Sequence, residues 1–125
     1  MPRASKAEAV VVMESEVLTS RHAELDDFTV VFEEYHVDAD GSPVFRGLPD
    51  DRCQSPHWGY VVRGRVTFRF ADREESYRAG DAYYAPPGHI PVVTAGTEVV
   101  EFSPAAEYRL TQEAIARNMA AAGAV

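Results

Sequence analysis

Three side chains in the middle of the sequence are of the types that bind transition metals. Cys53 and His57 lie four positions apart, and His89 follows 32 positions after His57 (89 − 57). A thiolate and two imidazoles favour zinc, iron or copper over magnesium or calcium, which prefer oxygen ligands. Three protein ligands would leave one coordination position open for water or a substrate, as in catalytic metal sites. These residues therefore predict a site for one divalent transition metal.

The spacing of the first two candidates places a condition on this site. An even spacing on an extended segment puts Cys53 and His57 on one face, but four extended residues span ~13 Å. The two side chains can meet only if the chain bends between them, and Ser55 and Pro56 are suited to such a bend. If they meet, Cys53 could instead be a nucleophile that transfers its proton to His57.

Each of the three residues also has an explanation that involves no chemistry. A single cysteine is often a small buried apolar residue, and a histidine such as His89 could simply cap a turn. His36 and Glu101 are additional candidates for the same site. Tyr83 and Tyr84 are neighbours on an expected strand, so one of them faces the interior, where its hydroxyl could orient a substrate.

The segments around these candidates have the pattern of short β-strands. Val66, Phe68 and Phe70 alternate with polar residues, which predicts a strand with one buried face. The β-branched and aromatic run at 60–62 predicts a second strand, joined to the first by a turn at Gly64. Further along, a Pro-Pro-Gly corner at 86–88 stands directly before His89 and is stiff enough to hold it in place.

Two of these segments resemble the two motifs of the cupin superfamily, whose members are small antiparallel β-barrels. Residues 60–68 have the pattern Y-V-V-x-G-x-V-x-F, and residues 79–89 have the pattern A-G-D-x-x-x-x-P-P-G-H. The resemblance covers residues 52–104 and looks closest to small single-domain bacterial cupins with C-x-x-x-H-W-G-Y and P-P-G-H. It implies an all-β, jelly-roll-like cupin barrel of six to eight core strands that holds a small-molecule ligand.

The motif positions of metal-binding cupins are only partly kept. Their first motif offers His-x-His, three residues and then Glu, and these positions fall on Asp51, Cys53 and His57. Their second motif has a histidine at the position of Pro91, whereas this chain has His89. Two functions stay open. One is a metal-binding cupin that holds or transforms a small organic molecule, as an oxygenase, isomerase or lyase if it is an enzyme. The other is a metal-free binding or sensing module.

Size and charge bound the remaining possibilities. The 125 residues predict one domain over 1–125, with a core barrel over about 9–104 and a C-terminal helix packed outside it over about 108–122. A net charge of −8 argues against nucleic acid or an anionic membrane as partner. No apolar run reaches the ~18–20 residues of a membrane span. The single cysteine excludes an internal disulfide and fits a cytoplasmic protein.

Two further expectations concern the C-terminal helix and an early strand. Thr111 is the expected N-cap of the helix and Gly123 its expected stop. In the strand expected over 28–37, Glu34 and His36 continue the apolar face of Phe28, Val30 and Phe32, so either a bulge intervenes or they point inward near the barrel mouth.

A homodimer is also expected. Residues 9–13 form a continuous apolar run, expected as a strand covered on both faces. Trp58 and Tyr60 have the opposite parity from His57 and are expected on the outside. A partner would then cover the N-terminal strand or these aromatic side chains.

Overall fold

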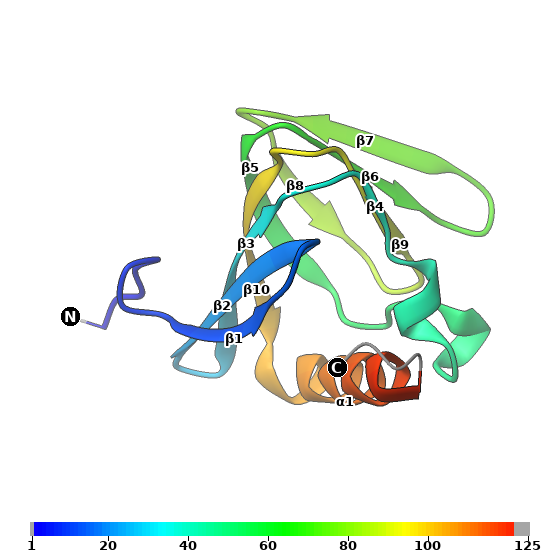
Figure 1. The fold of residues 1–125 in the computed structure, drawn as a ribbon, viewed down its shortest axis with the longest axis horizontal. Coiled ribbons are helices and arrows are strands. Elements are labelled where there is room, and N and C mark those ends of the chain that lie inside the picture. Colours follow the sequence, from blue (N-terminus) through cyan, green and yellow to red (C-terminus); the bar gives the residue numbers. More distant parts are fainter. Residues whose placement is uncertain (1, 122–125) are drawn as a thin grey trace.

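The chain forms two antiparallel sheets that face each other, followed by one helix (Figure 1). The computed structural model describes residues 2–121. The six-stranded sheet contains, in spatial order, β1 (Val10–Glu14), β2 (Leu18–Leu25), β3 (Phe28–Tyr35), β10 (Glu98–Pro104), β5 (His57–Arg63) and β8 (Ala82–Ala85). The four-stranded sheet contains β4 (Ala39–Asp40), β9 (Ile90–Val93), β6 (Arg65–Arg69) and β7 (Glu74–Arg78). Residues 2–121 thus hold ten strands, more than the six to eight expected.

Two short 3₁₀ helices interrupt the strands at Ser42–Phe45 and Pro49–Asp51, and the α-helix α1 covers Ala105–Ala121. Among residues 2–121, no helix combines the length and the apolar character that crossing a membrane requires.

Strand β6 shows why the two sheets pack face to face. Val66 and Phe68 are only 3% and 2% exposed, whereas Arg65 is exposed, as the alternation in the sequence predicts. Val61 of β5 and Val99 of β10 come from the facing sheet and belong to the same buried cluster. Burial of these side chains between the sheets is the main force that closes the barrel.

Helix α1 lies across one open end of the barrel rather than against its outer wall (Figure 1). It begins at Ala105, three residues before the expected start, and Thr111 is a buried residue within the helix rather than its N-cap. At the start of the helix, the N–H of Ala105 donates to the Asp27 carbonyl at 2.9 Å and so satisfies one of the N–H groups that lack a partner within the helix. The expected stop at Gly123 lies outside the described residues.

Strand β3 presents a different face to the interior from the one that the sequence suggested. Val30 and Val31 are each 1% exposed, so both faces of β3 are covered and the apolar alternation does not distinguish them. Glu33 and Tyr35 line the cavity between the sheets. Glu34 lies on the opposite face, where it pairs with Lys6.

Strand β1 is at the edge of the six-stranded sheet and is not covered on both faces within one chain. Val10, Val11 and Val12 are 67%, 42% and 50% exposed. Its partner β2 holds it on one side only, with Val10 opposite His22. The burial expected for this strand is therefore absent from the single chain.

Candidate metal centre

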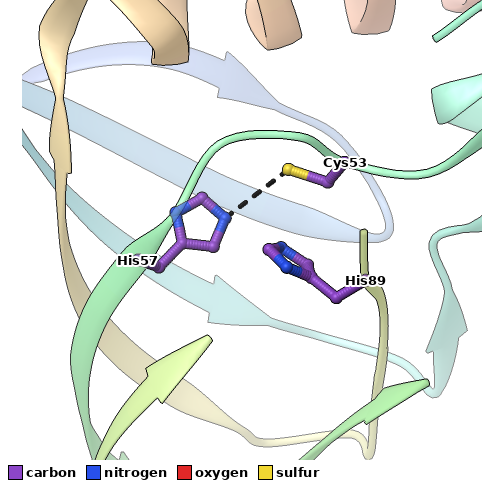
Figure 2. Close-up of side chains that lie close together, drawn as sticks. All are labelled: Cys53, His57 and His89. Carbon is purple, nitrogen blue, oxygen red and sulfur yellow. Dashed lines mark hydrogen bonds between the residues drawn. The ribbon is translucent and has the colours of Figure 1, made fainter. Parts of the chain in front are cut away.

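Cys53, His57 and His89 meet between the two sheets. One donor atom from each residue lies within 4.8 Å of the others, and the three side chains are 1%, 5% and 0% exposed. Figure 2 shows the thiol and the two imidazole rings turned toward one another. Residues separated by up to 36 positions (89 − 53) thus form one buried cluster with two types of metal-binding group.

A bend between the first two residues brings them together. Residues 54–56 lie outside any strand, with a bend at Ser55, and β5 begins at His57. The Sγ atom of Cys53 is consequently 3.6 Å from Nε2 of His57, whereas an extended segment of four residues would span ~13 Å. The chain therefore bends between Cys53 and His57, as the contact between their side chains requires.

Backbone pairing places His89 beside Cys53. The N–H of Cys53 donates to the His89 carbonyl at 2.9 Å, and the N–H of Gly88 donates to the Cys53 carbonyl at 2.8 Å. Gly88 has a φ of +94°, which other residues rarely adopt, so the chain can turn there into this bridge. His89 is fully buried and packs against Phe68.

In each of the two imidazoles, Nδ1 already has a hydrogen-bond partner outside the cluster. Nδ1 of His89 is 2.7 Å from the Pro86 carbonyl, which can only accept, so this nitrogen carries the proton. Nε2 of His89 is then a bare acceptor, and it is the buried side-chain nitrogen without a hydrogen-bond partner in residues 2–121. Nδ1 of His57 is 2.6 Å from Oγ of Ser103 on β10. Both rings therefore direct Nε2 into the cluster.

Burial keeps the three groups neutral when no ion is bound. It lowers the pKa of His57 to about 4 and that of His89 to about 3, with the neighbouring His57 adding to the effect on His89. Burial also raises the pKa of the Cys53 thiol to about 12. A thiol that keeps its proton is a poor nucleophile at neutral pH, so the raised pKa of Cys53, rather than its distance from His57, argues against a nucleophile pair.

The distance between two of the donor atoms suits a transition metal. A tetrahedral ion ~2.3 Å from sulfur and ~2.05 Å from nitrogen separates the two donors by ~3.6 Å. Sγ of Cys53 and Nε2 of His57 lie at this separation of 3.6 Å. The unpartnered Nε2 of His89 provides a third lone pair, and an unpaired buried polar atom is costly unless something binds it.

Of the four additional candidate residues, two are buried beside the cavity or in its wall and two are on the surface. Glu101 is 9% exposed and lines the cavity, and Tyr83 is 6% exposed and donates its hydroxyl to Glu101. Tyr84 is on the outer face of β8 and is 47% exposed. His36 is exposed at the end of β3, where its Nε2 lies 2.9 Å from Oγ1 of Thr19, and it is not brought into the cluster.

The cluster lies in the wall of a cavity of about 640 Å³, a volume within the range of small-molecule sites. Three cavity or support residues escaped the sequence analysis. Glu33 was missed because the parity of β3 was assigned to the wrong face, and Tyr108 because the helix was placed outside the barrel. Ser103 was missed because nothing in the sequence links it to His57, 46 positions away.

Known proteins with similar structures share this architecture. No protein-family model matches the chain, and no curated protein matches its sequence. The polyketide cyclase RemF from Streptomyces resistomycificus is 19% identical, with a TM-score of 0.59 over 84% of this chain and 80% of that one. An RmlC-like cupin from Shewanella frigidimarina is 19% identical, with a TM-score of 0.57 over 81% and 88%. The FeII form of HppE is 7% identical, with a TM-score of 0.58 over 82% of this chain and 60% of that one.

These similarities show the fold. The two antiparallel sheets with one C-terminal helix form a cupin barrel, which confirms the fold class expected from the sequence. Within that barrel, the chain carries a buried Cys–His–His cluster that could hold a metal ion.

Proposed function

We propose that this protein is a metal-binding cupin that holds or transforms a small organic molecule in its cavity. Cys53, His57 and His89 would bind one divalent transition metal through sulfur and two nitrogens. The observation that carries the proposal is the buried Nε2 of His89, which faces a thiol and a second imidazole and has no partner in residues 2–121.

The donor types narrow the choice of ion. One soft thiolate and two imidazoles suit zinc, iron or copper, whereas magnesium and calcium prefer oxygen ligands. Such an ion would supply a Lewis acid with an open position toward the cavity. The chain itself would exclude water through the apolar wall and hold both imidazoles in a fixed orientation through Pro86 and Ser103.

The structural neighbours are consistent with a small organic ligand. RemF is a polyketide cyclase, and HppE was solved with iron(II). Two proteins with this barrel therefore act on an organic molecule or hold a transition metal. We extend to this chain only the general use of the barrel interior and neither their substrates nor their reactions.

Metal analysis of protein purified without an affinity tag tests the proposal. Wild-type protein, as purified or after addition of zinc, iron or copper, should contain about one ion per chain. Cys53→Ser and His89→Gln should each lose most of it, and Cys53→Ser should weaken zinc most because it removes the only soft ligand. His36→Gln is the matched control, since His36 lies outside the cluster, and should retain the metal.

The opposite outcome has a definite meaning. If wild-type protein stays far below one ion per chain with each of the three metals, the protein is a metal-free binding or sensing module that uses the same cavity.

We also propose that the chain forms a homodimer, for which the outer face of the six-stranded sheet gives support. Large apolar side chains that are 38–47% exposed form an aromatic patch on it: Phe28, Trp58, Tyr60, Val62, Tyr84 and Phe102. Trp58 stacks on Tyr84 at 5.0 Å and meets Phe28 edge-on at 6.3 Å, so the patch is continuous across neighbouring strands. A contiguous exposed patch of this kind is typical of protein interfaces.

A further inference from the structure

Two carboxyl groups line the cavity that contains the metal donors. Glu33 is on β3 and Glu101 is on β10, and these strands are paired with Glu33 opposite Val99 and Glu101 opposite Val31. The two glutamates are therefore diagonal neighbours on one face of the sheet, a separation that long side chains can bridge. Glu33 accepts hydrogen bonds from the hydroxyls of Ser20 and Tyr35, each at 3.1 Å.

The position of Glu101 depends on a contact across strand β5. The Tyr83 hydroxyl donates to Oε2 of Glu101 at 2.5 Å, although β5 lies between their strands. The ring of Tyr83 crosses β5 at Gly59, where a Cβ atom would lie 2.5 Å from the ring. The other oxygen of Glu101 accepts no hydrogen bond from any residue between 2 and 121, so it is available to a group in the cavity.

A tyrosine on the helix supplies a complementary donor. Tyr108 of α1 is 8% exposed and lines the same cavity, and its hydroxyl has no hydrogen-bond partner among the described residues. Burial, together with the charges of Glu33, Glu101 and Cys53, raises the pKa of Tyr108 well above its ordinary value. Its O–H therefore keeps its proton and can donate. The hydroxyl is open to the cavity rather than fully enclosed, so a polar group of a ligand can take the place of solvent there.

We infer that Glu101 and Tyr108 together bind a hydroxyl group of the organic ligand. The ligand O–H donates to the free oxygen of Glu101, and the same ligand oxygen accepts from Tyr108. This inference rests on the proposed function in one respect, namely that the cavity holds a small organic molecule. It does not depend on the metal.

The pairing of one acceptor with one donor selects the chemical class. When the glutamates are ionised, a ligand carboxylate has no proton for Glu101 and is repelled by both of them. An ammonium group is attracted by the carboxylates but has no lone pair for the phenol, so it leaves Tyr108 without a partner. A neutral hydroxyl both donates and accepts. The remaining wall is largely apolar, with Val66, Phe68, Val93 and Ile115 among its residues. The ligand is therefore a neutral alcohol, phenol or enol with an apolar body.

Three probes of matched shape test this inference on EDTA-treated, full-length protein: benzyl alcohol, benzylamine and benzoate. Binding is followed by NMR shifts and by titration. Benzyl alcohol should bind most tightly, and Tyr108→Phe should weaken it about 3- to 10-fold, because one neutral hydrogen bond is lost. Glu101→Gln should weaken it ~10-fold or more, because an amide that accepts from Tyr83 presents N–H to the cavity. Tyr84→Phe is the matched control on the outer surface and should change nothing.

Several outcomes would overturn the inference. They are no binding of benzyl alcohol at millimolar concentration, equal or tighter binding of benzylamine or benzoate, or unchanged affinity in both cavity variants. Failure of the metal proposal gives a different pattern, in which wild-type protein binds no metal but still prefers the alcohol. Conversely, metal at about one ion per chain without any preference among the three probes would overturn this inference alone.

Discussion

The side chain of His57 is held from behind by Ser103, with Nδ1 and Oγ 2.6 Å apart and both residues buried. With its proton on Nδ1, the imidazole donates to the serine and directs the lone pair of Nε2 toward Cys53. We predict that Ser103→Ala lowers metal affinity about 10- to 100-fold, the usual cost of removing a group that orients a metal ligand. The loss is measured by competition with a chelator of known affinity.

A serine elsewhere on the barrel provides the control for this variant. Ser76 is exposed on β7, its hydroxyl lies 2.7 Å from that of Thr67, and it is not part of the cluster. Ser76→Ala should leave metal affinity unchanged. Equal affinities for Ser103→Ala and wild-type protein would show that the Ser103 contact does not orient a ligand.

The second prediction concerns the pH dependence of stability. Burial raises the pKa of both Glu33 and Glu101 to about 7, because neither carboxyl has a cationic partner in the cavity. Each group holds its proton more tightly in the folded state than in the unfolded state. Their contribution to stability is thus fully present below the ordinary glutamate pKa of about 4.3 and is lost as pH rises toward 7.

The comparison of Glu101→Gln with wild-type protein isolates this effect. The titratable groups near Glu101 include Glu33, Tyr35, Cys53, Tyr83 and Tyr108, and the variant leaves all of them in place. Relative to Glu101→Gln, wild-type protein should lose about 3 to 4 kcal/mol of unfolding free energy between pH 4 and pH 8, because the pKa of Glu101 is raised from about 4.3 to about 7 and each pKa unit is worth 1.36 kcal/mol. Urea unfolding at a series of pH values measures it. A difference that is constant with pH would refute the prediction.

The third prediction concerns the glycine beneath Tyr83. A Cβ atom at Gly59 would lie 2.5 Å from the Tyr83 ring and hydroxyl, closer than real side chains approach. Gly59→Ala should therefore destabilise the protein by about 1 to 3 kcal/mol, the typical cost of overpacking, and displace the hydroxyl from Glu101. A double-mutant cycle provides the control: in a Tyr83→Leu background the same change should cost less. Equal costs in both backgrounds would exclude the clash with Tyr83 as the cause.

The fourth prediction concerns assembly. Trp58 lies at the centre of the aromatic patch and is 45% exposed. Trp58→Glu would place a charge in the proposed interface and should convert the homodimer to a monomer, measured by analytical ultracentrifugation at micromolar concentration. Leu110→Glu is the control, because Leu110 is 63% exposed on the helix and lies outside the patch. A wild-type protein that sediments as a monomer at that concentration would refute the dimer.

The strands around the motif segments could be predicted from the sequence because their physical determinants are local. Alternation of Val66 and Phe68 with polar residues requires one buried face, and Gly64 and the Pro-Pro-Gly corner before His89 restrict the backbone at single positions. The types and spacing of Cys53, His57 and His89 likewise indicated which residues could share a site before their positions were known.

The inner surface of the cavity was decided by contacts between distant segments. Strand β3 is covered on both faces at Val30 and Val31, so only its pairing with β10 determines that Glu33 faces inward and Glu34 outward. Tyr108 reaches the cavity because helix α1 lies across the open end of the barrel. The hydrogen bond from the N–H of Ala105 to the Asp27 carbonyl attaches the start of that helix to a distant loop. Local sequence determines which strands can form, but it carries no information on such long-range pairing, because the free energy that selects it comes from burial shared between segments.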